Sequence, residues 1–131
     1  NFNLNISTPE SFKPDNSRIK QVKKHGRTIN YYPDPREAVE NADVVITDTW
    51  SSMGTKESKV RLLKFSKYQV NKKLMDLAKK NAIFLHCMPA HRGQEVTSEV
   101  IDGSNSLVLE EAFNRLHVQK SILLWCLNMD F

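Results

Sequence analysis

The sequence has few cysteines and no long apolar run, the features of disulfide-stabilised and membrane-spanning proteins. Only two cysteines occur among its 131 residues, Cys87 and Cys126, and they form no CxxC pair. Two distant cysteines are not a disulfide framework, so we expect a reducing compartment. No apolar run approaches the roughly 20 residues of a membrane-spanning helix, and no signal peptide follows Asn1. We therefore expect no membrane partner.

Motifs for nucleotides, metals and nucleic acids are also missing. The sequence has neither GxGxxG nor a Walker A motif, which leaves dinucleotide and nucleoside-triphosphate sites without support. The net charge is +4, but the basic residues are spread out and no exposed aromatic pattern accompanies them, so we expect no nucleic-acid surface. The residues that could bind zinc lack the spacing of a closed zinc site; they are His86, Cys87, His91 and His117.

What is present is the pattern of one α/β domain. The chain is 40% hydrophobic and 26% charged, an ordinary globular composition, and its length fits a single domain. Short apolar runs alternate with helical segments, which predicts a mostly parallel sheet with helices packed on it. We expect strands at residues 4–8, 28–32, 43–48, 82–87 and 106–109, and helices at 15–25, 35–41, 57–66, 71–80 and 111–127.

Three of these elements carry specific expectations. Asp34 should cap the helix that starts with Pro35, since Pro is favoured at the first helical position. The strand at 43–48 is apolar at consecutive positions, which is typical of a strand buried on both faces. The helix at 111–127 is apolar on more than one side, so it should be buried against something.

Ligands of parallel α/β sheets bind outside the carboxyl ends of the strands, and polar residues follow three predicted strands. Asp48 is the first. A carboxylate there either pairs with a cation or caps a turn. Ser52 adds a hydroxyl and Gly54 permits a tight turn, so the loop could hold a small zwitterion, with Asp48 on its ammonium and a backbone N–H on its carboxylate.

Cys87 and Arg115 follow the other two strands. Cys87 is either a small apolar filler or, beside Asp48 and a cation, a thiol with a tuned pKa that joins proton transfer. Pro89 interrupts the strand after Met88, which leaves the carbonyls of Cys87 and Met88 free to accept hydrogen bonds from a ligand. Arg115 either forms a surface ion pair with a neighbouring glutamate or points into the cleft to stabilise an oxyanion or a phosphate. His86 should point to the opposite face of the sheet from Cys87, which argues against a Cys/His dyad.

These segments resemble motifs of the ornithine carbamoyltransferases. Residues 48–54, Asp-Thr-Trp-Ser-Ser-Met-Gly, resemble the family's D-x-W-x-S-M-G loop. Residues 86–93 resemble H-C-L-P-A-H-R-G with Met88 in place of Leu, and residues 111–115 resemble E-A-E-N-R with Phe113 in place of Glu. Tyr-Gln-Val-Asn at 68–71 also matches, and the resemblance runs from about Leu4 to Leu127. The S-M-G loop favours ornithine over aspartate or putrescine.

The resemblance implies transfer of the carbamoyl group of carbamoyl phosphate to the side-chain amine of L-ornithine, which gives L-citrulline and phosphate in arginine metabolism. It implies that Asp48, Ser52 and Met53 hold ornithine, Met53 through its backbone. Cys87 would sit near the reacting amine and help its deprotonation, while the carbonyls of Cys87 and Met88 take the carbamoyl NH2. Arg115 would polarise the carbamoyl oxygen. Neither a metal nor an organic cofactor is implied.

The resemblance also implies what the chain lacks. It lacks the family's S-x-R-T and H-P-x-Q motifs, which belong to a carbamoyl-phosphate domain. We therefore expect residues 1–131 to be a carbamoyltransferase's carboxyl-terminal, ornithine-binding domain, truncated at its start. Its Rossmann-like three-layer sheet should lack the first, central strand, between residues 4–8 and 43–48. The isolated chain should be inactive, and the whole protein a cytoplasmic homotrimer, or one in the mitochondrial matrix of a eukaryote. The alternative is a non-catalytic amino-acid-binding or interaction module derived from this fold. Phe113 leaves open what orients Arg115.

Overall fold

The computed structural model describes residues 2–24, 26, 28–50 and 59–128. Strands and helices alternate along the chain, as the sequence predicts. In chain order the elements are β1 (Leu4–Ile6), the 3-10 helix η1 (Glu10–Phe12), α1 (Asn16–Lys24), β2 (Ile29–Tyr31), α2 (Pro35–Val39), β3 (Val44–Thr47), α3 (Lys59–Phe65), the 3-10 helix η2 (Ser66–Tyr68), α4 (Lys72–Met75), β4 (Ile83–His86), α5 (Ser98–Ile101) and α6 (Val108–Cys126).

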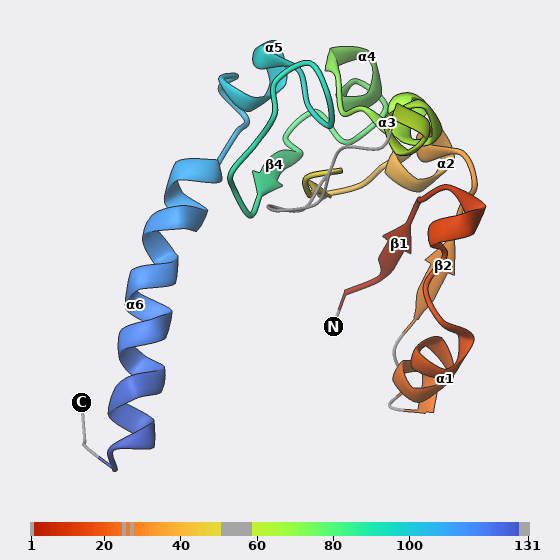
Figure 1. Cartoon of the computed structure of the whole chain (residues 1–131). Helices are drawn as coiled ribbons and strands as arrows, with labels where there is room; N and C mark the ends of the chain where they lie inside the picture. Colours follow the sequence, from red (N-terminus) through yellow and green to blue (C-terminus); the bar gives the residue numbers. More distant parts are fainter. Residues whose placement is uncertain (1, 25, 27, 51–58, 129–131) are drawn as a thin grey trace.

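The strands form two parallel pairs, β1 with β2 and β3 with β4. Among the described residues no strand joins the two pairs into one sheet. The predicted α/β class with parallel strands is confirmed. The two pairs separate between β1 and β3, the place where the resemblance implies a further strand. Figure 1 shows an arch: β1, β2 and α1 form one limb, α6 forms the other, and β4, α4 and α5 lie between them.

The hydrophobic core surrounds β3 and β4. Phe84 of β4 is fully buried, and apolar side chains from the neighbouring elements pack around it. The cluster comprises Val39, Val45, Val70, Leu74, Phe84, Val96, Val100, Ile101 and Val108. Phe84 at the centre of β4 and His86 at its carboxyl end are both buried, so the core anchors that end of the strand. The polar residues that follow β4 therefore start from a fixed position.

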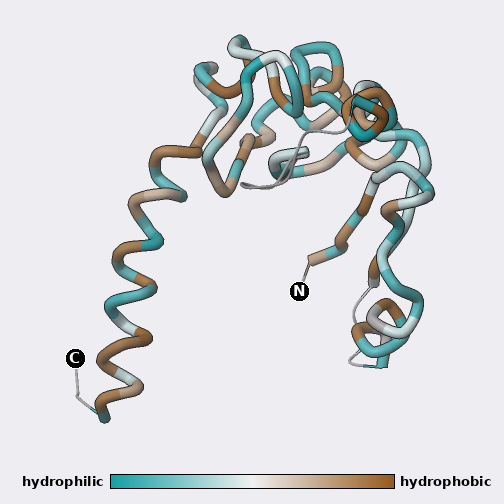
Figure 2. Tube along the Cα trace, in the orientation of Figure 1, coloured by the Kyte–Doolittle hydropathy of each residue, from teal (hydrophilic) through white to brown (hydrophobic). Residues whose placement is uncertain are grey.

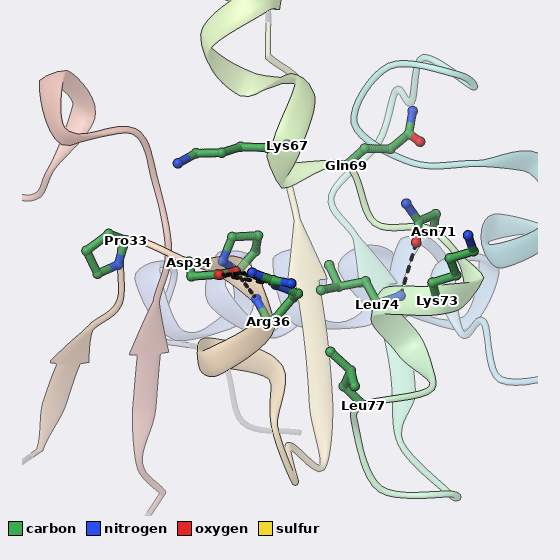
Figure 3. A pocket seen from close by; sticks show the side chains of 10 residues that line it. Pro33, Asp34, Arg36, Lys67, Gln69, Asn71, Lys73, Leu74 and Leu77 are labelled. Atoms are coloured by element: carbon green, nitrogen blue, oxygen red, sulfur yellow. Dashed lines mark hydrogen bonds and ion pairs between the residues drawn. The ribbon is translucent and has the colours of Figure 1, made fainter.

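Local capping explains where the two short helices next to the core begin. Asp34 caps α2 as predicted: its Oδ1 accepts a hydrogen bond from the Arg36 backbone N–H over 2.9 Å. The Arg36 guanidinium also binds this carboxylate, and these bonds lower the pKa of Asp34 to about 2. Asn71 caps α4 through a 3.0 Å bond from the Leu74 N–H to its Oδ1. The caps lie around a hollow of ≈ 520 Å³ between α2 and α4 (Figure 3).

Two predicted elements have the wrong extent or type. The strand predicted at residues 106–109 is wrong, because only Ser106 forms a bridge, to Phe84, and α6 already begins at Val108. The acidic residues 110 and 111 favour this early start, since negative charge stabilises a helix amino terminus. The helix predicted at 71–80 ends at Met75. After Met75 the chain forms isolated hydrogen-bonded turns in place of a continuous helix. The Lys79 N–H donates a hydrogen bond to the Ala42 carbonyl over 3.1 Å.

Two predictions of burial are also wrong for this chain. Within β3, Val45 is buried, but Ile46 is 65% exposed, so the strand is covered on one face only. In α6 only Val108 is buried, whereas Leu109, Phe113 and Trp125 are exposed. Figure 2 shows hydrophobic residues all along the helix. The described helices include none that is long and apolar enough to span a bilayer.

Candidate functional site

The carboxyl ends of β3 and β4 bring Asp48 and Cys87 together. Thr47 is in register with His86, so the next residue of each strand leaves the sheet at the same edge. The Cys87 Sγ donates a hydrogen bond to the Asp48 Oδ1 over 3.0 Å. Both residues are exposed. The strand-end rule therefore joins two residues that are 39 positions apart into one polar site.

The two groups perturb each other in opposite directions. The bond to Asp48, followed by burial, raises the pKa of Cys87 to about 11. The same bond lowers the pKa of Asp48, and the Thr49 N–H adds a second donor to its Oδ1 over 2.6 Å. At neutral pH the pair therefore consists of a protonated thiol and an ionised carboxylate. Its negative charge lies on Asp48, and no Lys or Arg of the described residues pairs with that carboxylate.

His86, the residue before Cys87, points the other way and is buried. Its Nδ1 accepts a 2.9 Å hydrogen bond from the Met88 N–H, so the ring proton lies on Nε2. The Nε2 atom is 3.3 Å from the Oε1 of Glu95, a carboxylate that is also fully buried. Glu95 accepts a further bond from the His91 backbone N–H. The prediction that His86 and Cys87 do not act as a dyad agrees with this geometry.

These buried contacts hold the turn at Met88. Met88 has φ 54, a left-handed conformation that is unfavourable for a residue with a Cβ. The bond from its own N–H to His86 offsets part of that cost. Further along, Gln69 Nε2 donates to the carbonyls of Gly93 and Gln94 over 2.9 and 2.8 Å. Hydrogen bonds thus hold the segment that follows β4 at its start, Met88, and at its end, Gly93 and Gln94.

Arg115 lies on α6 and is exposed. In the described part of the chain no hydrogen bond or ion pair links it to Asp48, to Cys87 or to a neighbouring glutamate. The surface ion pair with a neighbouring glutamate, one of the two interpretations of Arg115, is therefore not formed. One turn earlier on the helix, Glu111 Oε2 accepts a 3.0 Å hydrogen bond from the His86 backbone N–H. The start of α6 is thereby attached to the end of β4.

Three predicted site residues, Ser52, Met53 and Gly54, lie outside the described residues. The residue at the start of their loop, Trp50, is buried, and its ring lies 5.8 Å from that of Phe65. The hollow in Figure 3 has none of the predicted site residues in its lining. Among the described residues, no three His, Cys, Asp or Glu side chains form a group that could hold a metal ion.

Sequence reasoning missed three residues of this site: Glu95, Glu111 and Gln69. Each acts through a contact with a residue far away in sequence or with a backbone group. Gln69 and Glu111 lie in matching motifs and Glu95 lies two residues beyond one, but no spacing rule indicates the partners of these residues. Only Glu95 has a local feature, since it stands next to the core residue Val96, where a buried carboxyl group needs a hydrogen-bond partner.

Comparison with known proteins identifies one family throughout. Residues 1–126 match the family model described as the aspartate/ornithine carbamoyltransferase, Asp/Orn binding domain. An ornithine carbamoyltransferase of Rhodopseudomonas palustris is 56% identical over 126 residues, which are 96% of this chain and 41% of that protein. The ornithine carbamoyltransferase of Pyrococcus furiosus superposes with a TM-score of 0.84 and 44% identity, covering 93% of this chain and 41% of its own.

A further solved structure, the anabolic ornithine carbamoyltransferase of Campylobacter jejuni, gives a TM-score of 0.86 at 38% identity. It covers 98% of this chain and 44% of its own. The chain thus spans about two fifths of the length of the curated relatives that it matches, 41% in the case above. The similarity covers nearly all of this chain.

Proposed function

The chain belongs to the aspartate/ornithine carbamoyltransferase family, as its Asp/Orn-binding domain, and we propose that it is the ornithine-binding part of an ornithine carbamoyltransferase. The whole protein transfers the carbamoyl group of carbamoyl phosphate to the side-chain amine of L-ornithine, and L-citrulline and phosphate are its products. The observation that carries the proposal is the 3.0 Å contact between Asp48 and Cys87, two motif residues, at the shared edge of β3 and β4.

Asp48 is the proposed partner of the α-ammonium of ornithine. It is ionised, it is exposed, and in the described residues no Lys or Arg neutralises it. A hydrogen bond between an ammonium and a carboxylate is roughly twice as strong as a neutral one. Ser52 and the backbone of Met53 complete the proposed ornithine site through their places in the D-x-W-x-S-M-G motif.

Cys87 is the proposed neighbour of the reacting amine. Without substrate its proton is held by the charge of Asp48, which raises its pKa to about 11. An ammonium beside Asp48 would counter that charge and favour the thiolate. Ornithine binding therefore itself lowers the pKa of Cys87 and prepares it to assist deprotonation. Before attack, the side-chain ammonium must lose one proton to become an amine. The amine nitrogen then bonds to the carbamoyl carbon to give a tetrahedral intermediate. That intermediate collapses as its C–O bond to phosphate breaks and the second nitrogen proton passes to the leaving phosphate.

The turn after β4 and the start of α6 are the proposed carbamoyl side of the site. The carbonyls of Cys87 and Met88 are proposed to accept the carbamoyl NH2, and His86 holds the backbone of that turn. Arg115 is proposed to polarise the carbamoyl oxygen and to stabilise the tetrahedral intermediate. Hydrogen-bond donors aimed at developing negative charge commonly contribute a hundredfold or more to a rate.

The remaining parts of the machinery are proposed to lie in the rest of the protein. A carbamoyl-phosphate domain would bind the phosphate and cover exposed apolar surface of α6. By resemblance, the whole protein is a cytoplasmic homotrimer. It forms citrulline in arginine metabolism. The separate cysteines Cys87 and Cys126, both free, are in keeping with a reducing compartment.

A hybrid enzyme tests the proposal. This chain replaces the matching span of a full-length ornithine carbamoyltransferase relative, and citrulline formation from ornithine and carbamoyl phosphate is measured. We expect turnover in the hybrid. A folded hybrid that binds ornithine without forming citrulline would support the non-catalytic module instead, and one that neither binds nor turns over would refute the proposed function.

The same hybrid tests the role of Asp48. Asp48→Asn removes a charge-assisted bond worth about 1.5–3 kcal/mol, so the KM for ornithine should rise at least tenfold. The KM for carbamoyl phosphate should stay within about threefold. Asp43→Asn is the matched control, because Asp43 directly precedes the other end of β3 and pairs with Lys79. Equal losses for both substrates would contradict the assigned role.

A further inference from the structure

Glu111 forms a contact between the two parts of the site that the proposed reaction does not yet use. It lies in the first turn of α6, and its Oε2 accepts the His86 N–H over 3.0 Å. His86 is the last residue of β4 and directly precedes Cys87. The carboxylate therefore binds the backbone at the point where the strand passes into the candidate site.

This bond is the only polar contact of the Glu111 side chain in the described part of the chain, where no Lys or Arg pairs with it. The residue is half-buried, whereas its neighbour Glu110 is exposed and makes no such bond. Both acidic residues stabilise the helix amino terminus. A general helix-end effect therefore applies equally to Glu110 and Glu111, and the bond to His86 distinguishes them.

The bond matters because little else attaches α6 to the domain. Val108 is the one buried residue of the helix. Before it, the Leu107 N–H bonds to the Phe84 carbonyl over 2.9 Å. Glu111 adds a third attachment, one turn beyond Val108. Two attachments at the very end of a helix allow it to swing, and a third one further along opposes that swing.

Arg115 follows Glu111 by four residues, so the two side chains lie on the same face of α6, about 6 Å apart at Cβ. Since Glu111 faces the end of β4, the i, i+4 spacing leads us to expect Arg115 on the same side of the helix. The position of the guanidinium therefore depends on how α6 is attached. A displacement of about 1 Å in such a group can cost a hundredfold in rate.

We propose that Glu111 is a positioning residue that fixes the start of α6, and with it Arg115, against the strand end that carries Cys87. This inference rests on the proposed function and names a further determinant of the same site. Glu111 acts through the length and acceptor oxygen of its side chain. Its charge has a secondary effect, since it contributes to the raised pKa of Cys87.

Two variants separate reach from charge. Glu111→Gln keeps the length and an acceptor oxygen but loses the charge, whereas Glu111→Asp keeps the charge but is one methylene shorter. In the hybrid enzyme we expect Glu111→Asp to lower kcat at least tenfold with the KM for ornithine within about threefold. Glu111→Gln should lose clearly less, and Glu110→Asp should match the unsubstituted hybrid. Circular dichroism and thermal unfolding confirm that each variant is folded.

Three outcomes overturn the proposal. The first is that Glu111→Gln loses more kcat than Glu111→Asp, which would assign the role to charge. The second is a loss confined to the KM for ornithine, which would assign Glu111 to substrate binding. The third is an equal loss of kcat in Glu110→Asp, which would show that Glu111 acts only as a negative charge at the helix amino terminus.

A measurement on the chain itself separates this proposal from the proposed function. The backbone amide of His86 is observed by NMR, and its hydrogen exchange reports the bond to Glu111. We expect Glu111→Asp to speed exchange at that amide at least tenfold and Glu111→Gln to change it less. An unsubstituted hybrid without turnover would count against the proposed function alone. Unchanged exchange in Glu111→Asp would overturn the positioning role, whatever the hybrid does.

Discussion

The contact between Cys87 and Asp48 makes a quantitative prediction about thiol reactivity. The pKa of Cys87 is raised from 9.0 to about 11, with the bond to Asp48 as the largest cause. Asp48→Asn removes the negative charge that opposes the thiolate, so the pKa of Cys87 should fall towards its ordinary value. At pH 7.5 a thiol of pKa 11 is about 0.03% ionised and one of pKa 9 about 3%, roughly a hundredfold difference.

The rate gain is smaller than the gain in thiolate. The intrinsic nucleophilicity of a thiolate falls as its pKa falls, with a Brønsted coefficient of about 0.4–0.5. A decrease of about two pKa units therefore makes each thiolate roughly eightfold less reactive, which offsets part of the hundredfold gain in thiolate. We therefore expect Asp48→Asn to react about tenfold faster with an aromatic disulfide reagent such as DTNB. The change should also appear in the pH dependence: the rate for the unsubstituted chain should still rise steeply at pH 9–10, where that of the variant levels off.

The assay needs a background without the second thiol. Cys126 is exposed near the end of α6, so both proteins carry Cys126→Ser. As a matched control, Asp48→Asn in a Cys87→Ser chain should leave the reaction of Cys126 unchanged. Rates for Cys87 that agree within twofold with and without the Asp48 charge, or a slower variant, would refute the reasoning. Near-identical circular dichroism spectra exclude unfolding as the source of any acceleration.

Three further predictions concern activity and stability. The isolated chain should form no citrulline from ornithine and carbamoyl phosphate, and turnover well above that of its Cys87→Ala variant would contradict this. Phe84→Ala should lower the free energy of unfolding by about 3–5 kcal/mol in urea titrations, because Phe84 is fully buried, while Ile46→Ala, at a side chain 65% exposed, should cost under about 0.5 kcal/mol. Gly103→Ala should destabilise by about 1–3 kcal/mol, because its Cβ would lie 2.7 Å from the Glu99 carbonyl oxygen; no loss relative to an exposed Ser104→Ala control would argue against that clash.

The parts of the fold that the sequence predicts correctly rest on local chemistry. Asp34 before Pro35 is a cap followed by a favoured first helical residue, and both act within one turn. The contact between Asp48 and Cys87 matches one of the two interpretations of Cys87, and it follows from a general property of parallel sheets. Neither prediction requires knowledge of which side chain packs against which.

The parts that could not be predicted depend on specific distant partners. The bond from the His86 N–H to Glu111 joins residues 25 positions apart, and nothing in either local pattern indicates it. The same holds for Glu95, whose burial beneath His86 depends on the path of the whole turn after β4. Such contacts form only when the chain has folded. The sequence therefore shows the two glutamates but not the groups that they contact.

The errors in predicted burial have a different origin, and they bear on function. A hydrophobic pattern indicates which faces of a helix or strand are apolar. Exposure in the structure shows which of these faces are buried by other residues of this chain. In α6 the two disagree most: Leu116, Ile122 and Trp125 are 62%, 52% and 77% exposed. Apolar patches larger than a few hundred Å² are uncommon on monomers and mark interaction surfaces. Because α6 also carries Arg115, contacts that cover its apolar residues would restrain the same helix that Glu111 attaches to β4. Completion of the site and burial of α6 are therefore expected to occur together.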